Sequence, residues 1–192
     1  MQIEVRSDIL VYEAKSFYNT FINLYDFSQN DVMYFVPAIV NGSFSVELGI
    51  KAILSKRGIK YGRDHNLVIL FEKLPEDIQD TIWRWVEEKN PYYADTGARN
   101  KELLLISDIF TQWRYCFERD GAVAVDLGFL SVFANAVIGV MFYLGYNVEM
   151  VKTEAYEASN ADAEKILAMN RSRFIEKNAR KIKKRTKTTQ KT

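Results

Sequence analysis

Hydrophobic residues recur every three to four positions along most of this chain, and stretches that alternate with a period of two are scarce. Such spacing is typical of amphipathic helices, and no alternation of strands with helices interrupts it. We therefore expect an all-α protein, an up-and-down helical bundle of four to five main helices with an additional C-terminal helix and a basic tail. The predicted helices span residues 7–26, 31–57, 65–73, 75–90, 101–118 and 125–144, and a last one starts at residue 161.

Residues typical of helix ends support several of these limits. Gly58 is a suitable stop residue, and Pro75 is a suitable first residue for the helix that follows it. Pro37 is expected near the first turn of its helix or at a kink in it. The segment Pro91–Asn100 is rich in turn residues and is predicted to be an exposed loop. The first helix is expected to bury Ile9, Tyr12, Phe17, Phe21 and Leu24.

The longest uncharged stretch, Leu127–Tyr146, has the twenty residues that a membrane-spanning helix needs. Ser131 and Asn135 lie inside it, and the segment that follows lacks the flanking Lys and Arg of a membrane anchor. The other helices are amphipathic and need an apolar partner, so we expect this helix to be the buried centre of the bundle rather than a membrane span. A membrane-associated helical protein is the second alternative.

The composition fits one globular domain with an appendage, because the 192 residues are 48% hydrophobic and 14% aromatic. We place a helical bundle in residues 1–146 and a C-terminal helix with the tail in residues 147–192. The lone Cys116 and the lone His65 argue against an internal disulfide framework and a metal site of the usual kind, so no metal or cofactor is expected. The N-terminal residues show no secretory signal, and we expect a cytoplasmic protein.

The net charge of +1 hides a division of charge by sign. Residues 1–170 hold 16 Lys and Arg against 24 Asp and Glu, whereas residues 171–192 hold 10 against 1. Such a basic segment either binds nucleic acid without sequence preference, stays a solvated tail, or docks on the acidic body. The candidate nucleic-acid-binding residues of the tail are Arg171, Arg173, Arg180, Lys181, Lys183, Lys184 and Arg185.

Two predicted helices carry charged residues within their apolar faces. Glu47 and Lys51 are four residues apart, in the order that favours an ion pair. Arg114 lies in the apolar stripe of residues 101–118, and Glu118 follows one turn later. A buried guanidinium needs acceptors, and Glu47 and Glu118 are the candidates. These four residues form either a buried network that fixes the helix register or a polar pocket that binds a nucleotide or an RNA phosphate.

His65 follows a Gly-Arg-Asp turn and precedes an apolar run, which places it at or near the start of a short helix. It is either a capping or packing residue or, as an anion ligand or general base, part of a functional site. The chain has no glycine-rich phosphate loop and no Gly-x-Ser-x-Gly turn, so the usual signatures of catalysis are missing from the sequence.

Three segments, in this order and spacing, resemble the HEPN domain family of all-α bundles. They are Asn41–Leu54 (NGSFSVELGIKAIL), His65–Pro75 (HNLVILFEKLP) and Trp113–Glu118 (WRYCFE). The resemblance covers about residues 7–146 and implies a bundle that pairs into a homodimer. Many similar proteins are metal-independent RNA endonucleases of toxin–antitoxin, abortive-infection or CRISPR-linked systems, and others bind nucleotides or partner proteins.

The nuclease branch of this family carries an Arg, four to six further residues and then a His. Here Arg57 is one residue too far from His65, and Arg63 is too close. We therefore expect a binding protein rather than an enzyme, acting on RNA, a nucleotide or a protein partner encoded nearby, in antiviral defence or a toxin–antitoxin system. The alternative function is a metal-independent RNA endonuclease that uses Arg114 together with His65.

Overall fold

The computed structural model describes residues 7–107 and 125–145, all of which belong to the first of the two units into which the chain divides, Met1–Val148. These residues form helices and no strand, which confirms the all-α prediction. Two short 3-10 helices, η1 (Val32–Tyr34) and η2 (Pro91–Ala94), lie between the longer ones. The α-helices are α1 (Ser7–Ser28), α2 (Phe35–Lys56), α3 (Leu67–Glu72), α4 (Glu76–Lys89), α5 (Thr96–Ser107) and α7 (Leu127–Tyr143).

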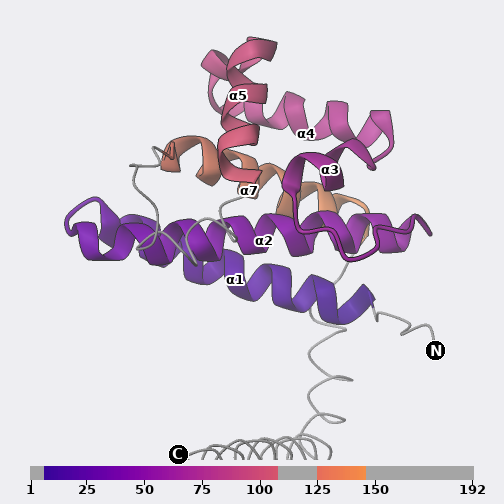
Figure 1. Ribbon diagram of the computed structural model, residues 1–192, viewed down its shortest axis with the longest axis horizontal. Helices are drawn as coiled ribbons and strands as arrows, with labels where there is room; N and C mark the ends of the chain where they lie inside the picture. Colours follow the sequence, from indigo (N-terminus) through magenta and orange to yellow (C-terminus); the bar gives the residue numbers. More distant parts are fainter. Residues whose placement is uncertain (1–6, 108–124, 146–192) are drawn as a thin grey trace, which may run out of the picture. The chain divides into compact units, whose positions relative to one another are not determined.

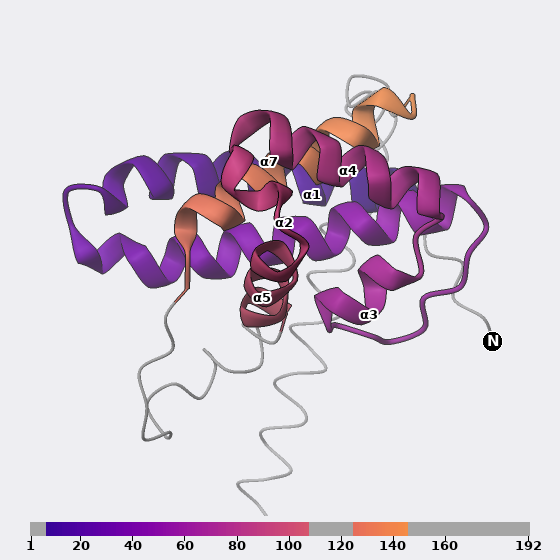
Figure 2. The same cartoon turned by 90° about the horizontal axis from the view of Figure 1, so that it is seen from above.

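The helices α1 and α2 form an antiparallel hairpin, joined through η1, and lie side by side along most of their length (Figure 1). The helix α7 packs against α1, α2 and α4. The short α3 contacts α2 and α5 and lies beside α5 in the view from above (Figure 2). The 3-10 helix η2 contacts α4 and α5. Three long helices therefore cover α7, which is the centre of the described bundle.

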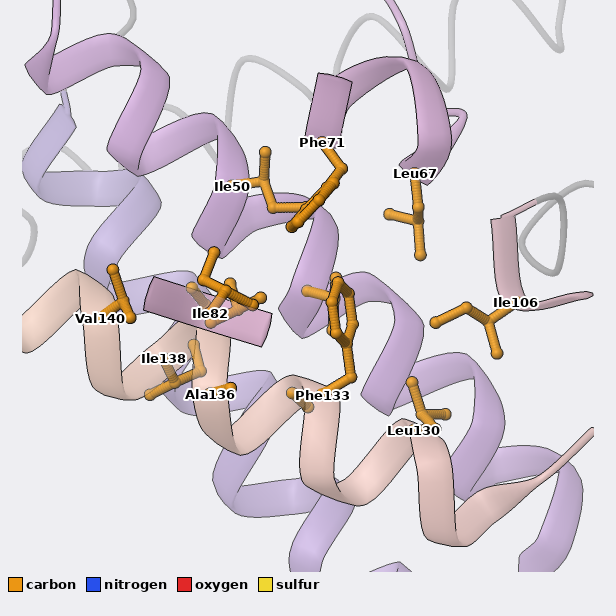
Figure 3. Packing of buried hydrophobic residues seen from close by; sticks show 14 of the residues in the cluster. Ile50, Leu67, Phe71, Ile82, Ile106, Leu130, Phe133, Ala136, Ile138 and Val140 are labelled. Carbon is orange, nitrogen blue, oxygen red and sulfur yellow. The ribbon is translucent and has the colours of Figure 1, made fainter. Parts of the chain in front are cut away.

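Phe133 of α7 is the hub of an aromatic cluster that joins three helices. Its ring centroid lies 5.7 Å from that of Phe71 in α3 and 5.3 Å from that of Trp83 in α4. Its ring also stacks on Phe129, one turn earlier in α7, at 5.5 Å. Figure 3 shows Phe71 and Phe133 directed into the same space, close to Ile50 of α2. A single apolar core thus holds these helices together.

Two glycines allow α7 to approach its neighbours closely. A Cβ atom on Gly49 of α2 would lie 2.8 Å from Val137 Cγ1 of α7, and one on Gly139 of α7 would overlap the ring of Trp85 in α4. Because well-packed cores do not accept even one extra methyl group without strain, these positions set the spacing of α7 from α2 and from α4.

The prediction that residues 125–144 form the buried central helix is confirmed, since most side chains of α7 are buried. Among the described residues, one helical stretch, Val32–Lys56, is long and apolar enough to cross a membrane. More than half of its most apolar window is buried inside the protein, and the core helix of a soluble protein passes the same test, so this finding is weak evidence in either direction.

The prediction of an exposed loop at Pro91–Asn100 is wrong. The 3-10 helix η2 begins at Pro91, and α5 begins at Thr96, five residues earlier than expected. Asn90 accepts a hydrogen bond from the backbone N–H of Tyr92 at 3.1 Å, and Asp95 accepts one from that of Ala98 at 2.7 Å. Asn90, just before the predicted loop, and Asp95, within it, therefore cap two helices.

The buried face of α1 also differs from the predicted one. Phe21 is fully buried as expected, but Ile9 and Tyr12 are exposed, and Phe17 and Leu24 are only partly buried. The face that packs against α2 and α7 is rotated by a fraction of a turn, because the apolar residues of α1 extend around more than half of the helix. The buried residues of α1 are Leu10, Val11, Ala14, Tyr18 and Phe21.

Asp126 and the buried Tyr93 hold the start of α7. Asp126 Oδ1 accepts a hydrogen bond from the N–H of Phe129 at 3.0 Å, which caps the helix, and Oδ2 accepts one from the Tyr93 hydroxyl at 2.8 Å. Burial, the hydrogen bond and the negative charge of Asp126 raise the pKa of Tyr93 well above its usual value. Burial and the same carboxylate raise the pKa of Glu102 on α5.

We expect Tyr93→Phe to lower the free energy of unfolding by about 1 kcal/mol at neutral pH, because one buried hydrogen bond is lost. The raised pKa of Tyr93 means that the folded protein holds this proton more tightly than the unfolded chain does. Its stabilising effect is thus complete below the ordinary tyrosine pKa of 10.0 and is lost as the pH rises above that value.

Urea unfolding from about pH 8 to about pH 11 measures this dependence. Stability should fall more steeply with pH in the parent protein than in Tyr93→Phe. Tyr61, whose pKa is also raised by burial, is present in both proteins and cancels in the comparison. Equal slopes would show that the Tyr93 hydroxyl is not held by Asp126.

Candidate functional site

Glu47 and Lys51 form a buried ion pair on successive turns of α2. The Lys51 ammonium donates a hydrogen bond to Glu47 Oε1 at 2.7 Å, and both side chains are buried. The pair predicted from the four-residue spacing is therefore present. Because two charges have been removed from water, each of them needs the other to stay in this position.

His65 joins this pair from the connection between α2 and α3. Its Nδ1 lies 2.9 Å from the same oxygen, Glu47 Oε1, while its side chain is 58% exposed. In the tautomer with a proton on Nδ1, the ring donates to the carboxylate, and the buried Glu47 then fixes the orientation of an imidazole that solvent can reach. This arrangement is the central feature of the site.

Two glycines shape the connection that brings His65 back to α2. The backbone angle φ is +68° at Gly58 and +66° at Gly62, a region that favours glycine. The N–H of Ile59 donates to the carbonyl of Leu54 at 2.9 Å, which ends α2 in the way that a C-terminal glycine permits. The predicted stop at Gly58 is therefore confirmed.

Lys51 of α2 and Lys73, the residue after α3, hold the same connection in place. The Lys51 ammonium lies 5.7 Å from the centroid of the Tyr61 ring, within reach of a cation–π contact. Lys73, just after α3, forms an ion pair with Asp64 and donates to the Tyr61 carbonyl at 3.4 Å. Lys51 thus contacts both Glu47 and Tyr61. His65 lies between Asp64, which Lys73 holds, and the start of α3.

The start of α3 places His65 outside the helix rather than in it. Asn66 Oδ1 accepts a hydrogen bond from the N–H of Ile69 at 3.0 Å, so Asn66 is the N-cap and α3 begins at Leu67. The buried Ser107 of α5 accepts a second hydrogen bond, from the N–H of Val68 at 3.1 Å. His65 is therefore not the capping residue, and its contact with Glu47 is its defining interaction in this site.

The surface around His65 is basic. Arg57, Lys60 and Arg63 are exposed and form no ion pair within the described residues. Asp64, the one acidic residue of the connection, is paired with Lys73. The charge of Glu47 is likewise compensated by Lys51, so the connection presents a net positive charge to a ligand.

Several predicted site residues lie outside the residues that the structure describes. They are Arg114 and Glu118 of the predicted charge network and all of the named tail residues. The expected contact between Arg114 and Glu47 therefore stays a prediction. In the described part of the chain, no group of three His, Cys, Asp or Glu side chains is placed to hold a metal ion. The residues concerned are Arg114, Glu118, Arg171, Arg173, Arg180, Lys181, Lys183, Lys184 and Arg185.

Sequence reasoning missed the link between His65 and Glu47, and also the roles of Tyr61, Asp64 and Lys73. These contacts join residues up to 18 positions apart, which no helical periodicity reveals. The pair of glycines at positions 58 and 62 was the available signal, because two such turns within five residues can reverse the chain toward α2.

Comparisons of the chain with models of protein families, with curated proteins and with solved structures find no match. The HEPN resemblance of the sequence therefore stays a prediction, and the case for a function rests on the geometry around His65.

We expect Glu47→Leu to lower the free energy of unfolding by about 3–5 kcal/mol, because it leaves the Lys51 ammonium buried without its carboxylate. The double variant Glu47→Leu/Lys51→Met replaces the pair by apolar side chains of similar size and should recover most of this loss. Urea unfolding followed by circular dichroism measures both. A single variant as stable as the parent protein would mean that Lys51 reaches water and that the pair is not a structural requirement.

Proposed function

We propose that this protein binds a phosphate-bearing ligand, RNA or a nucleotide, at the connection between α2 and α3. The observation that carries the proposal is the solvent-accessible His65 that the buried Glu47 orients within a basic surface. A binding role is also what the sequence favours, because the Arg–His motif of the nuclease branch is missing. The HEPN resemblance adds a homodimer that acts in antiviral defence or a toxin–antitoxin system, and the N-terminal residues favour a cytoplasmic location.

The charges of the site favour an anion over a cation or a neutral ligand. Glu47 is neutralised by Lys51, and Asp64 by Lys73, so neither carboxylate repels a phosphate strongly. Arg57, Lys60 and Arg63 come from one short stretch of chain, and arginine can bind phosphate oxygens in pairs. When both ring nitrogens carry a proton, Nδ1–H donates to Glu47 and Nε2–H can donate to a phosphate oxygen, and a ring that is held in place loses little entropy in doing so.

The basic residues after position 170 contribute to the same proposal in a different way. Ten Lys and Arg within residues 171–192 supply sequence-independent affinity for a polyanion, whereas a mononucleotide gains little from so extended a segment. Separating the two contributions is therefore also the way to tell RNA from a nucleotide as the preferred ligand.

We expect Lys60→Gln/Arg63→Gln to weaken binding of a labelled single-stranded RNA about tenfold at physiological salt. Because each neutralised phosphate contact changes the slope of log affinity against log salt by about 0.7 on single strands, the slope should become shallower by about 1.4. Fluorescence anisotropy in a salt series measures both quantities, and competition with ATP tests the nucleotide.

The matched control is Arg84→Gln/Lys89→Gln, which removes two exposed cations from α4. A second variant carries Gln at the seven named basic positions of the tail in the full chain. The proposal fails if the α4 control weakens binding as much as the site variant does. It also fails if the tail variant loses all binding while Lys60→Gln/Arg63→Gln binds as the parent protein does.

A metal-independent RNA endonuclease is the second candidate function, and the contact between Glu47 and His65 favours it. A histidine held by a carboxylate can take the proton of a ribose 2′-hydroxyl, whose oxygen then attacks the phosphorus and displaces the 5′-oxygen of the next nucleotide, which takes up a proton from water as it leaves. The products would be a 2′,3′-cyclic phosphate and a 5′-hydroxyl. The sequence offers Arg114 as the partner cation of this step, but Arg114 lies outside the described residues.

If the protein cleaves RNA, cleavage should persist in EDTA, and His65→Gln should reduce its rate at least about a hundredfold, since general base catalysis contributes that much or more. Glu47→Gln should reduce the rate less, because it retains the imidazole but removes the charge that orients it. Gel analysis of a labelled RNA gives both rates. Tight binding of RNA without any cleavage would reject the nuclease and leave the binding function in place.

A further inference from the structure

The turn between α1 and α2 lies at the left of Figures 1 and 2. Several apolar side chains at this turn are exposed. We call this surface the hairpin tip and define it as Phe27, Val32, Met33 and Val36. Their exposed fractions are 57%, 85%, 66% and 36%. None of the three residues of η1 is buried. Clustered apolar side chains that stay in water at an ordered site are a common sign of an interaction surface.

The hairpin tip is held in shape by its own contacts. Asp31 Oδ1 accepts a hydrogen bond from the N–H of Met33 at 2.9 Å, which caps η1. The ring centroids of Phe27 and Tyr34 are 5.3 Å apart, so the end of α1 is joined to the start of α2. The apolar side chains are therefore presented by a fixed backbone, and a partner need not order the loop in order to bind.

The charge around the hairpin tip has one sign. No Lys or Arg occurs between Lys15 and Lys51, whereas Asp26 and Asp31 lie at the tip itself. Both carboxylates are exposed and form no ion pair within the described residues. A partner that buries the apolar residues therefore gains from positive charges at the edge of its own apolar face.

We propose that the hairpin tip is a docking site for a cationic amphipathic helix of a protein partner. An anionic lipid surface fits less well, because membrane-binding surfaces place Lys and Arg beside their apolar residues and the tip has none. A second copy of this chain fits less well too, because a two-fold contact between tips would bring Asp26 and Asp31 against the same residues of the other copy. This site is separate from the phosphate site proposed above.

The test uses the full chain and a labelled helical peptide of about eighteen residues with leucine on one face and lysine on the other, a length that gives about five turns. Fluorescence anisotropy should show binding of this peptide and no binding of the same peptide with glutamate in place of lysine. Met33→Glu should weaken binding at least about tenfold, although it adds a negative charge that strengthens any unspecific attraction of the lysines.

The matched control is Leu104→Glu, since Leu104 on α5 is 64% exposed, close to the value for Met33. This variant should bind the peptide as the parent protein does. A second variant, Asp26→Asn/Asp31→Asn, should weaken binding several-fold while keeping the cap of η1, because asparagine caps as well as aspartate. Circular dichroism checks that each variant remains folded.

Three outcomes overturn the proposal. Equal or tighter binding by Met33→Glu would show that the peptide is attracted by charge alone. Sedimentation showing a dimer that Met33→Glu converts to a monomer would assign the tip to a second copy of this chain. Binding to phosphatidylcholine–phosphatidylglycerol vesicles that Met33→Glu abolishes, without any binding of the lysine peptide, would assign it to a membrane.

Discussion

Most of the apolar surface of α7 must be covered, and the rest of the described structure follows from this constraint. Its helix contains no charged residue, so any side left in water would cost free energy in proportion to its apolar area. The helices α1, α2 and α4 supply the cover. Close approach needs Gly49 and Gly139, and a wide contact needs long partners, which α1 and α2 are. The hairpin of α1 and α2 is thus needed to cover the apolar surface of α7.

The same constraint explains why a charged pair is found inside α2. Because α7 and α1 pack against this helix and the connection to α3 closes over it, nearly all of its second half is buried, including the positions of Glu47 and Lys51. Neither side chain can turn to water, so both charges are satisfied locally. His65 then reaches the carboxylate from outside. Packing of the core does not require the contact between the buried Glu47 and the exposed His65 ring, so this contact is a feature of the surface beside α2.

The sequence predicted those features that depend on local spacing. The ends of α4 and α7 were close to the observed ones, because Pro75 marks the start of the first of these helices and the long uncharged stretch marks the extent of the second. Residues 91–100 were misjudged because asparagine and aspartate form turns and cap helices with the same side-chain hydrogen bonds. The rotation of α1 and the contact of His65 with Glu47 depend on which surfaces meet in three dimensions, and no single helix carries that information.

The proposed ligand site and the hairpin tip lie at different positions along α2. His65 contacts Glu47, and the helix from Phe35 to Glu47 rises about 18 Å, so a phosphate ligand near His65 and a partner at Met33 do not collide. The helix α2 is fixed on α7 through Gly49 and Val137, where a shift along the axis would force atoms together. Because such a shift is opposed at this contact, we expect a ligand bound at one surface to leave the affinity of the other surface unchanged, with α2 fixing the distance between them.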